Sequence, residues 1–229
     1  LGASVSPWLR EKIGRVLFAP LHRTATRAYT RADRISAVSQ IYIDLAKPDE
    51  GPKSKVEDTF HLCYHGIDLQ DTGQTTNAES NPSFVLRPSS FVLTYIGALE
   101  RSYDLETAIR AVHELNSEFL RDSGSQREKN TTIELHIAGA GTNEPALKNL
   151  ANSLCASVSP CLCEFHGLLH RDALAALLAS SHAGLIPMRQ NSFVGFPYKL
   201  ADYCAAGLPV ISSLDGECRR LLDTKKAGL

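Results

Sequence analysis

Short apolar segments alternate regularly with segments of helical spacing from residue 91 onward. Leu105, Ile109 and Val112, for example, have the spacing of one helix face. Alternation with short connections is typical of an α/β domain whose parallel strands are joined by right-handed crossovers. The expected strands are FVLTYIG (91–97), IELHIAG (133–139), CEFHG (163–167), AGLIPM (183–188) and a segment that begins at Pro209. The sequence therefore predicts a Rossmann-like parallel sheet with helices on both faces, and such sheets bind ligands at the carboxyl ends of their strands.

The first 90 residues have a less regular pattern of helical and strand-like segments. Residues 8–31 have helical spacing, and Pro20 is expected to kink or divide that helix. A strand is expected at 33–39, then a helix, then a strand that ends near Asp68. Thr, Asn, Ser, Gly and Pro dominate the next 20 or so residues, as in a linker. The predicted parts are a first unit at 1–68, a linker or loop at 69–90 and the regular domain at 91–229.

The composition is that of a soluble globular protein, with 43% hydrophobic and 21% charged residues. The formal net charge of −1 does not support nucleic-acid binding. No apolar run approaches the roughly 20 residues that cross a bilayer. Cys161 and Cys163 are separated by one residue, which is poor spacing for metal chelation. We expect the cysteines to be free thiols in a reducing cytoplasm, with Cys204 as a small core residue.

The segment FPYKLADYCAAGLPVISS, at 196–213, combines a helix start, a helix end and two charged residues. Pro197 is tolerated in a first helical turn because its missing N–H would be unpaired there. Gly207 is expected to end the helix, since glycine readily adopts the left-handed cap conformation. The loop before Pro197 then points free N–H groups outward, as at an anion site. Lys199 and Asp202 are three residues apart and share a helix face, so an ammonium for phosphates lies beside a carboxylate for sugar hydroxyls.

This unit resembles the donor-binding motif of the family-4 retaining glycosyltransferases, which have the GT-B fold with two Rossmann-like halves. The matching residues are Phe196, Pro197, Lys199, Asp202, Tyr203 and those from 205 to 210. The resemblance covers roughly Arg34 to the C-terminus. It implies that 1–68 is the tail end of an N-terminal, acceptor-side domain and that 91–229 is most of a donor-binding domain. The chain is then expected to be a fragment that is inactive by itself.

The resemblance implies transfer of a sugar, with retention, from a nucleotide-sugar donor to a glycan or lipid-linked acceptor in bacterial polysaccharide or cell-envelope biosynthesis. It implies no cofactor and no metal held by the protein. Lys199 would be the catalytic residue, because it would stabilise charge on the departing diphosphate. Asp202 would hold the ribose hydroxyls of the donor. The other donor-binding residues are expected to be Gly97, Arg101, Gly139, Gly167, Leu168, Gly195, Phe196 and Pro197.

Several of these residues have a second interpretation. Gly139 and Gly141 also fit a tight turn, and Glu144 replaces the third glycine of an NAD fingerprint, which disfavours NAD binding. Arg101 also fits a solvated loop position. Val194 stands where many family-4 members have a glutamate that touches the donor sugar, so the sequence does not indicate the sugar. Three histidines are expected to be surface or hydrogen-bonded residues rather than metal ligands: His65, His166 and His170.

Two other functions share part of this pattern, namely a GT-B sugar-nucleotide epimerase and a non-catalytic protein that binds nucleotide-sugars. The epimerases share the architecture but lack the FPYK unit that contains Lys199. The segment from Arg10 to Arg34 contains seven basic and two acidic residues. It fits either peripheral contact with the inner, anionic face of a membrane or a solvated helix.

Overall fold

The computed structural model describes residues 7–46, 60–63, 90–121, 132–155, 162–190, 194 and 196–228. The chain divides into two compact units, Leu1–Tyr64 and His65–Leu229, and each is described by itself. The predicted linker at 69–90 lies outside the described residues, apart from Ser90. The domain boundaries drawn from the sequence therefore stay predictions.

The first unit contains two helices and a pair of parallel strands. Its elements are α1 (Pro7–Arg31), β1 (Ile35–Ala37), α2 (Gln40–Ala46) and β2 (Phe60–Leu62), and β1 pairs with β2. The helix α1 continues through Pro20, so the predicted division there is wrong. A proline removes only its own N–H from the ladder, and the Pro20 carbonyl oxygen accepts a hydrogen bond from the Thr24 hydroxyl at 2.9 Å.

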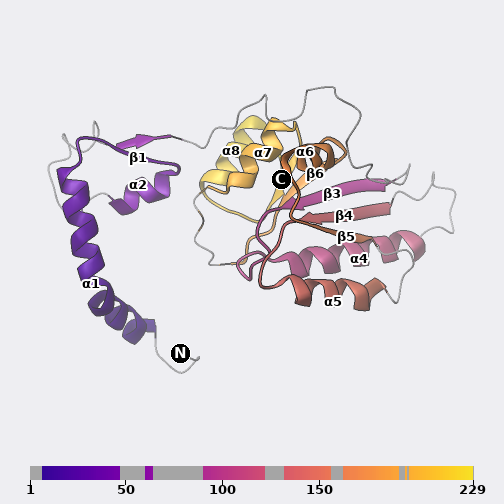
Figure 1. Ribbon diagram of the computed structural model, residues 1–229, viewed down its shortest axis with the longest axis horizontal. Helices are drawn as coiled ribbons and strands as arrows, with labels where there is room; N and C mark the ends of the chain where they lie inside the picture. Colours follow the sequence, from indigo (N-terminus) through magenta and orange to yellow (C-terminus); the bar gives the residue numbers. More distant parts are fainter. Residues whose placement is uncertain are drawn as a thin grey trace. The chain divides into compact units, whose positions relative to one another are not determined.

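The second unit is a five-stranded, wholly parallel sheet in the order β5-β4-β3-β6-β7. Helices α4 and α5 cover one face, and α6, α7 and α8 lie over the other (Figure 1). The predicted α/β class and parallel sheet are confirmed. The strands are β3 (Ser90–Ile96), β4 (Thr132–Ala138), β5 (Cys163–Gly167), β6 (Ala183–Ile186) and β7 (Val210–Ser212); the helices are α4 (Leu105–Arg121), α5 (Glu144–Cys155), α6 (Arg171–Ala179), α7 (Tyr198–Ala205) and α8 (Glu217–Lys225).

The sheet separates two hydrophobic cores because neighbouring residues of a strand point to opposite faces. In β4, Leu135 and Ile137 pack with the residues of α4 and α5, whereas Ala138 packs with those of α6, α7 and α8. The helix α7 is held against the second core by Leu200 and Tyr203, both at most 1% exposed. The first residue of the functional motif, Phe196, also belongs to this core.

Tyr203 anchors α7 to the middle of the sheet through its ring and its hydroxyl. A methyl group on Gly184 of β6 would lie 2.4 Å from the Tyr203 ring, so the ring packs directly on the strand backbone. The hydroxyl accepts the N–H of Ile96 at 3.1 Å. It shares its own proton between the carbonyl oxygens of Leu185 at 3.1 Å and Thr94 at 3.2 Å. This buried hydroxyl therefore fixes α7, and Lys199 on it, relative to β3 and β6.

Replacement of Tyr203 by phenylalanine is expected to lower the free energy of unfolding by about 1–3 kcal/mol, because it leaves the buried Ile96 N–H without its acceptor. Urea denaturation followed by circular dichroism measures this loss. Cys204→Ser, at the exposed neighbouring position of α7, is the control and should change stability by less than about 0.5 kcal/mol. Equal midpoints for the two variants would contradict the anchoring role.

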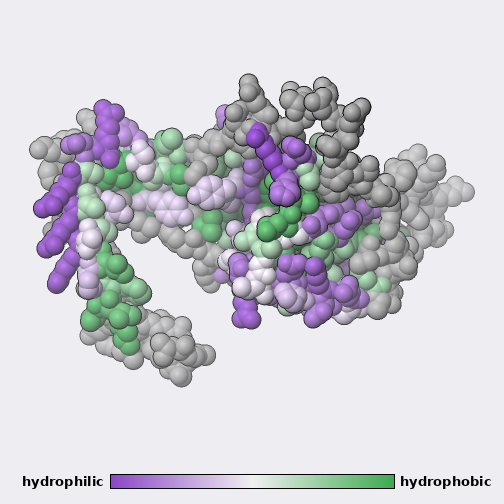
Figure 2. Space-filling model, viewed as in Figure 1, coloured by the Kyte–Doolittle hydropathy of each residue, from purple (hydrophilic) through white to green (hydrophobic). Residues whose placement is uncertain are grey.

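Among the side chains of α1 that the structure describes, the large apolar ones gather toward the N-terminal half and the arginines lie in the C-terminal half (Figure 2). These arginines are Arg23, Arg27 and Arg31. No helix among the described residues is long and apolar enough to cross a membrane. The exposed large apolar side chains of α1 are Ile13, Val16, Leu17, Phe18, Leu21 and Tyr29.

Candidate functional site

The loops that follow β3, β4 and β5 are joined by backbone hydrogen bonds at the carboxyl edge of the sheet. Gly97 donates to the carbonyl oxygen of Ala138 at 2.9 Å, and Gly139 donates to that of Gly167 at 2.7 Å. Leu99 donates to the carbonyl oxygen of Ala140 at 3.0 Å. Three glycines predicted to bind the donor, Gly97, Gly139 and Gly167, therefore lie in a row across three adjacent strands.

Close approach of two loops explains the glycine pair after β4. A Cβ atom on Gly139 would lie 1.8 Å from the carbonyl oxygen of Gly97, and one on Gly141 would lie 2.4 Å from that of Leu99. Both obstacles are backbone atoms, which cannot rotate away as a side chain can. Close packing of the two loops is thus a sufficient structural reason for both glycines, and a role in approaching a nucleotide stays a prediction.

Lys199 lies in the first turn of α7 and extends to the end of β3. Its side chain is 6% exposed, and a Cβ atom on Gly97 would be 3.3 Å from both its Cε and its Nζ. The ammonium lies 4.0 Å from the centre of the Tyr95 ring and 3.7 Å from that of Tyr103. These are cation–π distances. Among the described residues the Nζ has no hydrogen-bond partner, so a buried amine without a hydrogen-bonded anion lies at the row of glycines.

Burial controls the titration of the groups around this lysine. Desolvation lowers the pKa of Lys199 to about 7, from an ordinary value of 10.5. Burial also raises the pKa of Asp202, which is half-buried on the same helix. Because a nearby anion favours the protonated amine, a diphosphate against Lys199 would restore its charge.

The other residues predicted to bind the donor differ in exposure and position. Leu168 follows the row of glycines and is 80% exposed. Arg101 is exposed on the loop after β3 and has no ion pair or hydrogen bond among the described residues, which leaves its donor contact a prediction. Phe196 is 7% exposed and packs in the core, so its ring does not face a ligand. Pro197 is the N-cap residue of α7 rather than its first helical residue, and Gly195 lies outside the described residues.

Two features of this edge were not predicted from the sequence. Tyr95 and Tyr103 enclose the lysine, although nothing in the spacing of residues 95, 103 and 199 indicates that they meet. Glu100, in the loop after β3, accepts hydrogen bonds from the Thr142 N–H at 3.0 Å and the Thr142 hydroxyl at 2.6 Å. These bonds lower the pKa of Glu100 and join the loops after β3 and β4. They connect residues far apart in the chain, so no local sequence signal identifies them.

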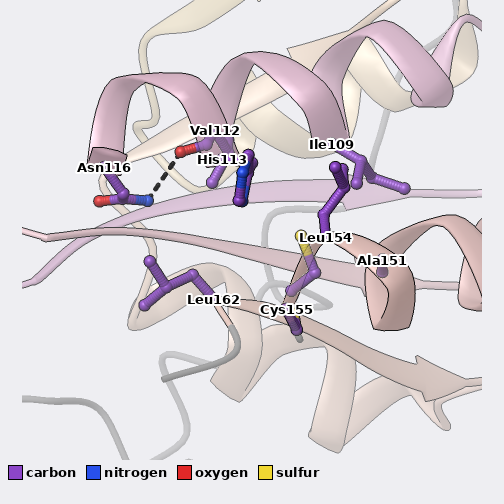
Figure 3. Close-up of a pocket in the computed structure, with 9 residues that line it drawn as sticks. Ile109, Val112, His113, Asn116, Ala151, Leu154, Cys155 and Leu162 are labelled. Carbon is purple, nitrogen blue, oxygen red and sulfur yellow. Dashed lines mark hydrogen bonds between the residues drawn. The ribbon is translucent and has the colours of Figure 1, made fainter. Parts of the chain in front are cut away.

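A small cavity between α4, α5 and the start of β5 is not part of this edge (Figure 3). Its volume of about 20 Å³ is room for about one water molecule, far too little for a nucleotide. Asn116 closes one end, donating to the Val112 carbonyl oxygen at 2.8 Å. We interpret it as a packing gap in the core rather than a ligand site.

The cysteines correct part of the sequence prediction. Cys155 is disulfide-bonded, whereas the other described cysteines are free: Cys63, Cys163, Cys204 and Cys218. The expectation of free thiols is therefore wrong for Cys155, because cysteine spacing alone does not reveal which pairs approach in the fold. Cys204 is exposed rather than in the core, since the preceding residue of α7, Tyr203, takes the core-facing position.

Comparison with protein families decides the relationship of the chain. A family model described as "Glycosyl transferases group 1" matches residues 90–229. The chain belongs to this family. The sequence interpretation of a glycosyltransferase is thereby confirmed at the level of this group, while the assignment to family 4 and the retaining mechanism stay proposals. No curated protein matched the chain in a sequence search.

Solved structures of GT-B glycosyltransferases share the fold of this group 1 chain. HepE from Anabaena, in complex with UDP and glucose, has 15% identity and a TM-score of 0.56, over 87% of this chain and 49% of HepE. The pneumococcal O-GlcNAc transferase GtfA, in complex with UDP and GlcNAc, has 16% identity and a TM-score of 0.56, over 86% of this chain and 33% of GtfA. The lipopolysaccharide outer core galactosyltransferase WaaB has 17% identity and a TM-score of 0.52, over 83% and 46%. The chain thus spans half or less of these relatives, which at this identity establish the fold alone.

Proposed function

We propose that the protein to which this chain belongs transfers a sugar from a nucleotide-sugar donor to a glycan or lipid-linked acceptor, with retention at the anomeric carbon. The observation that carries the proposal is the buried Lys199 amine, which lies against Gly97 at the carboxyl edge of the sheet and has no hydrogen-bond partner among the residues that the structure describes. A buried cation is costly unless it is paired, and a donor diphosphate would supply the missing charge. Membership of the group 1 glycosyltransferases and the UDP and sugars bound to HepE and GtfA support the same ligand class.

In this proposal each part of the edge has a separate task. Lys199 stabilises the negative charge that develops on the diphosphate as the sugar departs. Asp202 accepts hydrogen bonds from the ribose hydroxyls, and the turn at Gly167 and Leu168 contacts the base. The proposed transfer uses no cofactor and no metal at the diphosphate. The acceptor binds mainly to the acceptor-side half of the protein, so we expect this chain alone to bind donor without turnover.

Binding of nucleoside diphosphates tests the proposal directly. A ligand that binds only the folded chain raises its melting temperature with concentration and affinity, so the purified chain is titrated with UDP, GDP, ADP and their sugar conjugates. We expect one base to be preferred. Lys199→Met should weaken that binding roughly 10- to 100-fold, the loss expected for a charged hydrogen bond of about 1.5–3 kcal/mol.

The control is Lys148→Met, which removes an exposed lysine of α5 that pairs with Glu144 at 2.7 Å. It should leave the binding unchanged. Equal affinities of the Lys199→Met variant and the unmodified chain would sink the proposed role of the buried lysine. Binding without any transfer by the full-length protein would instead favour a non-catalytic nucleotide-sugar-binding protein. Interconversion of the free donor sugar would favour an epimerase.

Contact of α1 with a membrane surface is kept as part of the proposal for the whole protein. The exposed apolar residues of α1 would meet lipid tails, and Arg23, Arg27 and Arg31 would meet anionic headgroups. With this contact we propose the cytoplasmic side of a bacterial membrane as the location and polysaccharide assembly as the setting. Co-sedimentation with phosphatidylglycerol vesicles, but not with phosphatidylcholine vesicles, is the expected result. A variant with both Arg23→Gln and Arg27→Gln should lose this difference between the two kinds of vesicle.

A further inference from the structure

Two histidines and two glutamates form a polar cluster on β4 and β5. The sequence predicts that His166 is a surface or hydrogen-bonded residue rather than a metal ligand. In the structure the register between the two strands shifts after Ile137, so that Ile137 pairs with Phe165 and Ala138 with Gly167. His166 is the extra residue of this β-bulge, and bulges commonly redirect a side chain. The bulge brings His166 against His136.

The rings face each other through one nitrogen each. His136 Nδ1 and His166 Nε2 are 2.9 Å apart, and the ring planes are 20° from parallel with their centres 5.0 Å apart. The second nitrogen of each ring faces a carboxylate: His136 Nε2 lies 3.4 Å from Glu134 Oε2, and His166 Nδ1 lies 3.8 Å from Glu164 Oε1. The side chains of His136 and His166 are only 2% and 8% exposed. An imidazole with one nitrogen toward a carboxylate and the other toward a shared point is the arrangement of metal-binding histidines.

We propose that His136, Glu164 and His166 bind a zinc-type divalent metal ion, with Glu134 orienting His136. One ligand atom from each of the three lies within 4.8 Å of the others. Two imidazole nitrogens and one carboxylate oxygen suit Zn²⁺, with water as a fourth ligand. Tetrahedral bonds of about 2.1 Å place ligand atoms roughly 3.4 Å apart. The histidine nitrogens, now 2.9 Å apart, therefore need to separate by about 0.5 Å, with a turn of the rings that directs both lone pairs at the ion, and the exposed Glu164 side chain has room to approach.

The position of this cluster makes the metal structural rather than catalytic. His166 directly precedes Gly167, whose carbonyl oxygen accepts the Gly139 N–H. An ion held by His136 of β4 and His166 of β5 would fix the two strand ends to each other immediately before this hydrogen bond. The inference is independent of the proposed sugar transfer, because it uses no donor and no turnover.

Metal binding to the purified chain tests the site. After treatment with EDTA and dialysis, Zn²⁺ is titrated by calorimetry and counted by elemental analysis, and Co²⁺ is used as a visible probe of tetrahedral geometry. We expect one ion per chain, a rise in melting temperature that EDTA reverses, and tetrahedral Co²⁺ absorption. His166→Gln and Glu164→Gln should each weaken Zn²⁺ binding at least tenfold. His170→Gln, at an exposed position four residues further on, should not.

Every outcome bears on the proposal. Failure of the chain to bind Zn²⁺, or equal Zn²⁺ affinity of the unmodified chain and His166→Gln, would overturn the proposal. Equal affinity would mean that the ion binds elsewhere, for example at the free cysteines, which all variants keep. Glu164 is exposed, so Glu164→Gln is a test that does not depend on tolerance in the core. Glu134→Gln should weaken the affinity yet retain the tetrahedral Co²⁺ spectrum, as expected of a positioning residue. Loss of that spectrum would assign Glu134 as a ligand instead.

Discussion

Gly139→Ala is expected to cost more than about 4 kcal/mol of unfolding free energy, and so to leave the second unit largely unfolded at room temperature or only marginally stable. The added Cβ would lie 1.8 Å from the carbonyl oxygen and 2.8 Å from the carbonyl carbon of Gly97. Gly139 also has φ = +146°, which L residues rarely adopt. Relief would require the loop after β3 to move, which breaks the hydrogen bonds that join β3, β4 and β5. Circular dichroism and urea denaturation measure the loss.

Gly207→Ala is the matched control, because Gly207 also has a positive φ but an added side chain there would meet no other atoms. Gly207 has φ = +71°, yet a Cβ atom there would meet nothing within 4 Å. The control should cost only about 1–2 kcal/mol, the usual penalty of a left-handed conformation for a residue with a side chain. If the two variants were equally stable, the close packing of the loops after β3 and β4 would be wrong, and the glycine pair would need another explanation.

The parallel sheet could be predicted from the sequence because the patterns that define its strands and helices are local. Most strands of the second unit are apolar runs, and helical periodicity fills the intervals between strands, so the fold class follows from this alternation. The end of α7 also followed from local chemistry, since Gly207 has the predicted left-handed conformation. The continuation of α1 through Pro20 could not be predicted in this way, because whether a helix breaks at a proline depends on the surroundings of that proline.

Contacts between distant residues could not be predicted in this way. The enclosure of Lys199 by Tyr95 and Tyr103 depends on the side chains of three separate elements. The meeting of His136 and His166 accompanies one extra residue in β5; without that residue His166 would pair with Ala138, on the same face as His136 but two residues further along the strand. The sequence therefore located the lysine correctly on α7 without indicating that it is buried.

Burial of Lys199 should make both stability and diphosphate binding depend on pH. Its pKa is about 7 in the folded chain and near 10.4 when unfolded. Between these values the unfolded chain holds the extra proton, so the free energy of unfolding rises with pH, by up to about 2 kcal/mol from pH 7 to pH 9. Lys199→Met has no proton to lose and should lack this rise. It should also be more stable than the unmodified chain at pH 6–7, because it buries no charge.

Diphosphate affinity should change with pH in the opposite direction. Only the protonated lysine supplies the counter-charge, so the affinity should fall above pH 7, approaching tenfold per pH unit. Calorimetry of the preferred nucleoside diphosphate at pH 8, in buffers of different ionisation enthalpy, should detect uptake of close to one proton. With Lys199→Met the uptake should vanish and the affinity should be flat from pH 7 to 9. Proton uptake that persists in this variant would place the titrating group elsewhere, and Asp202, whose pKa burial raises, would be the next residue to replace. If Lys199→Met is more stable than the unmodified chain yet binds diphosphate more weakly, the lysine serves ligand binding rather than packing.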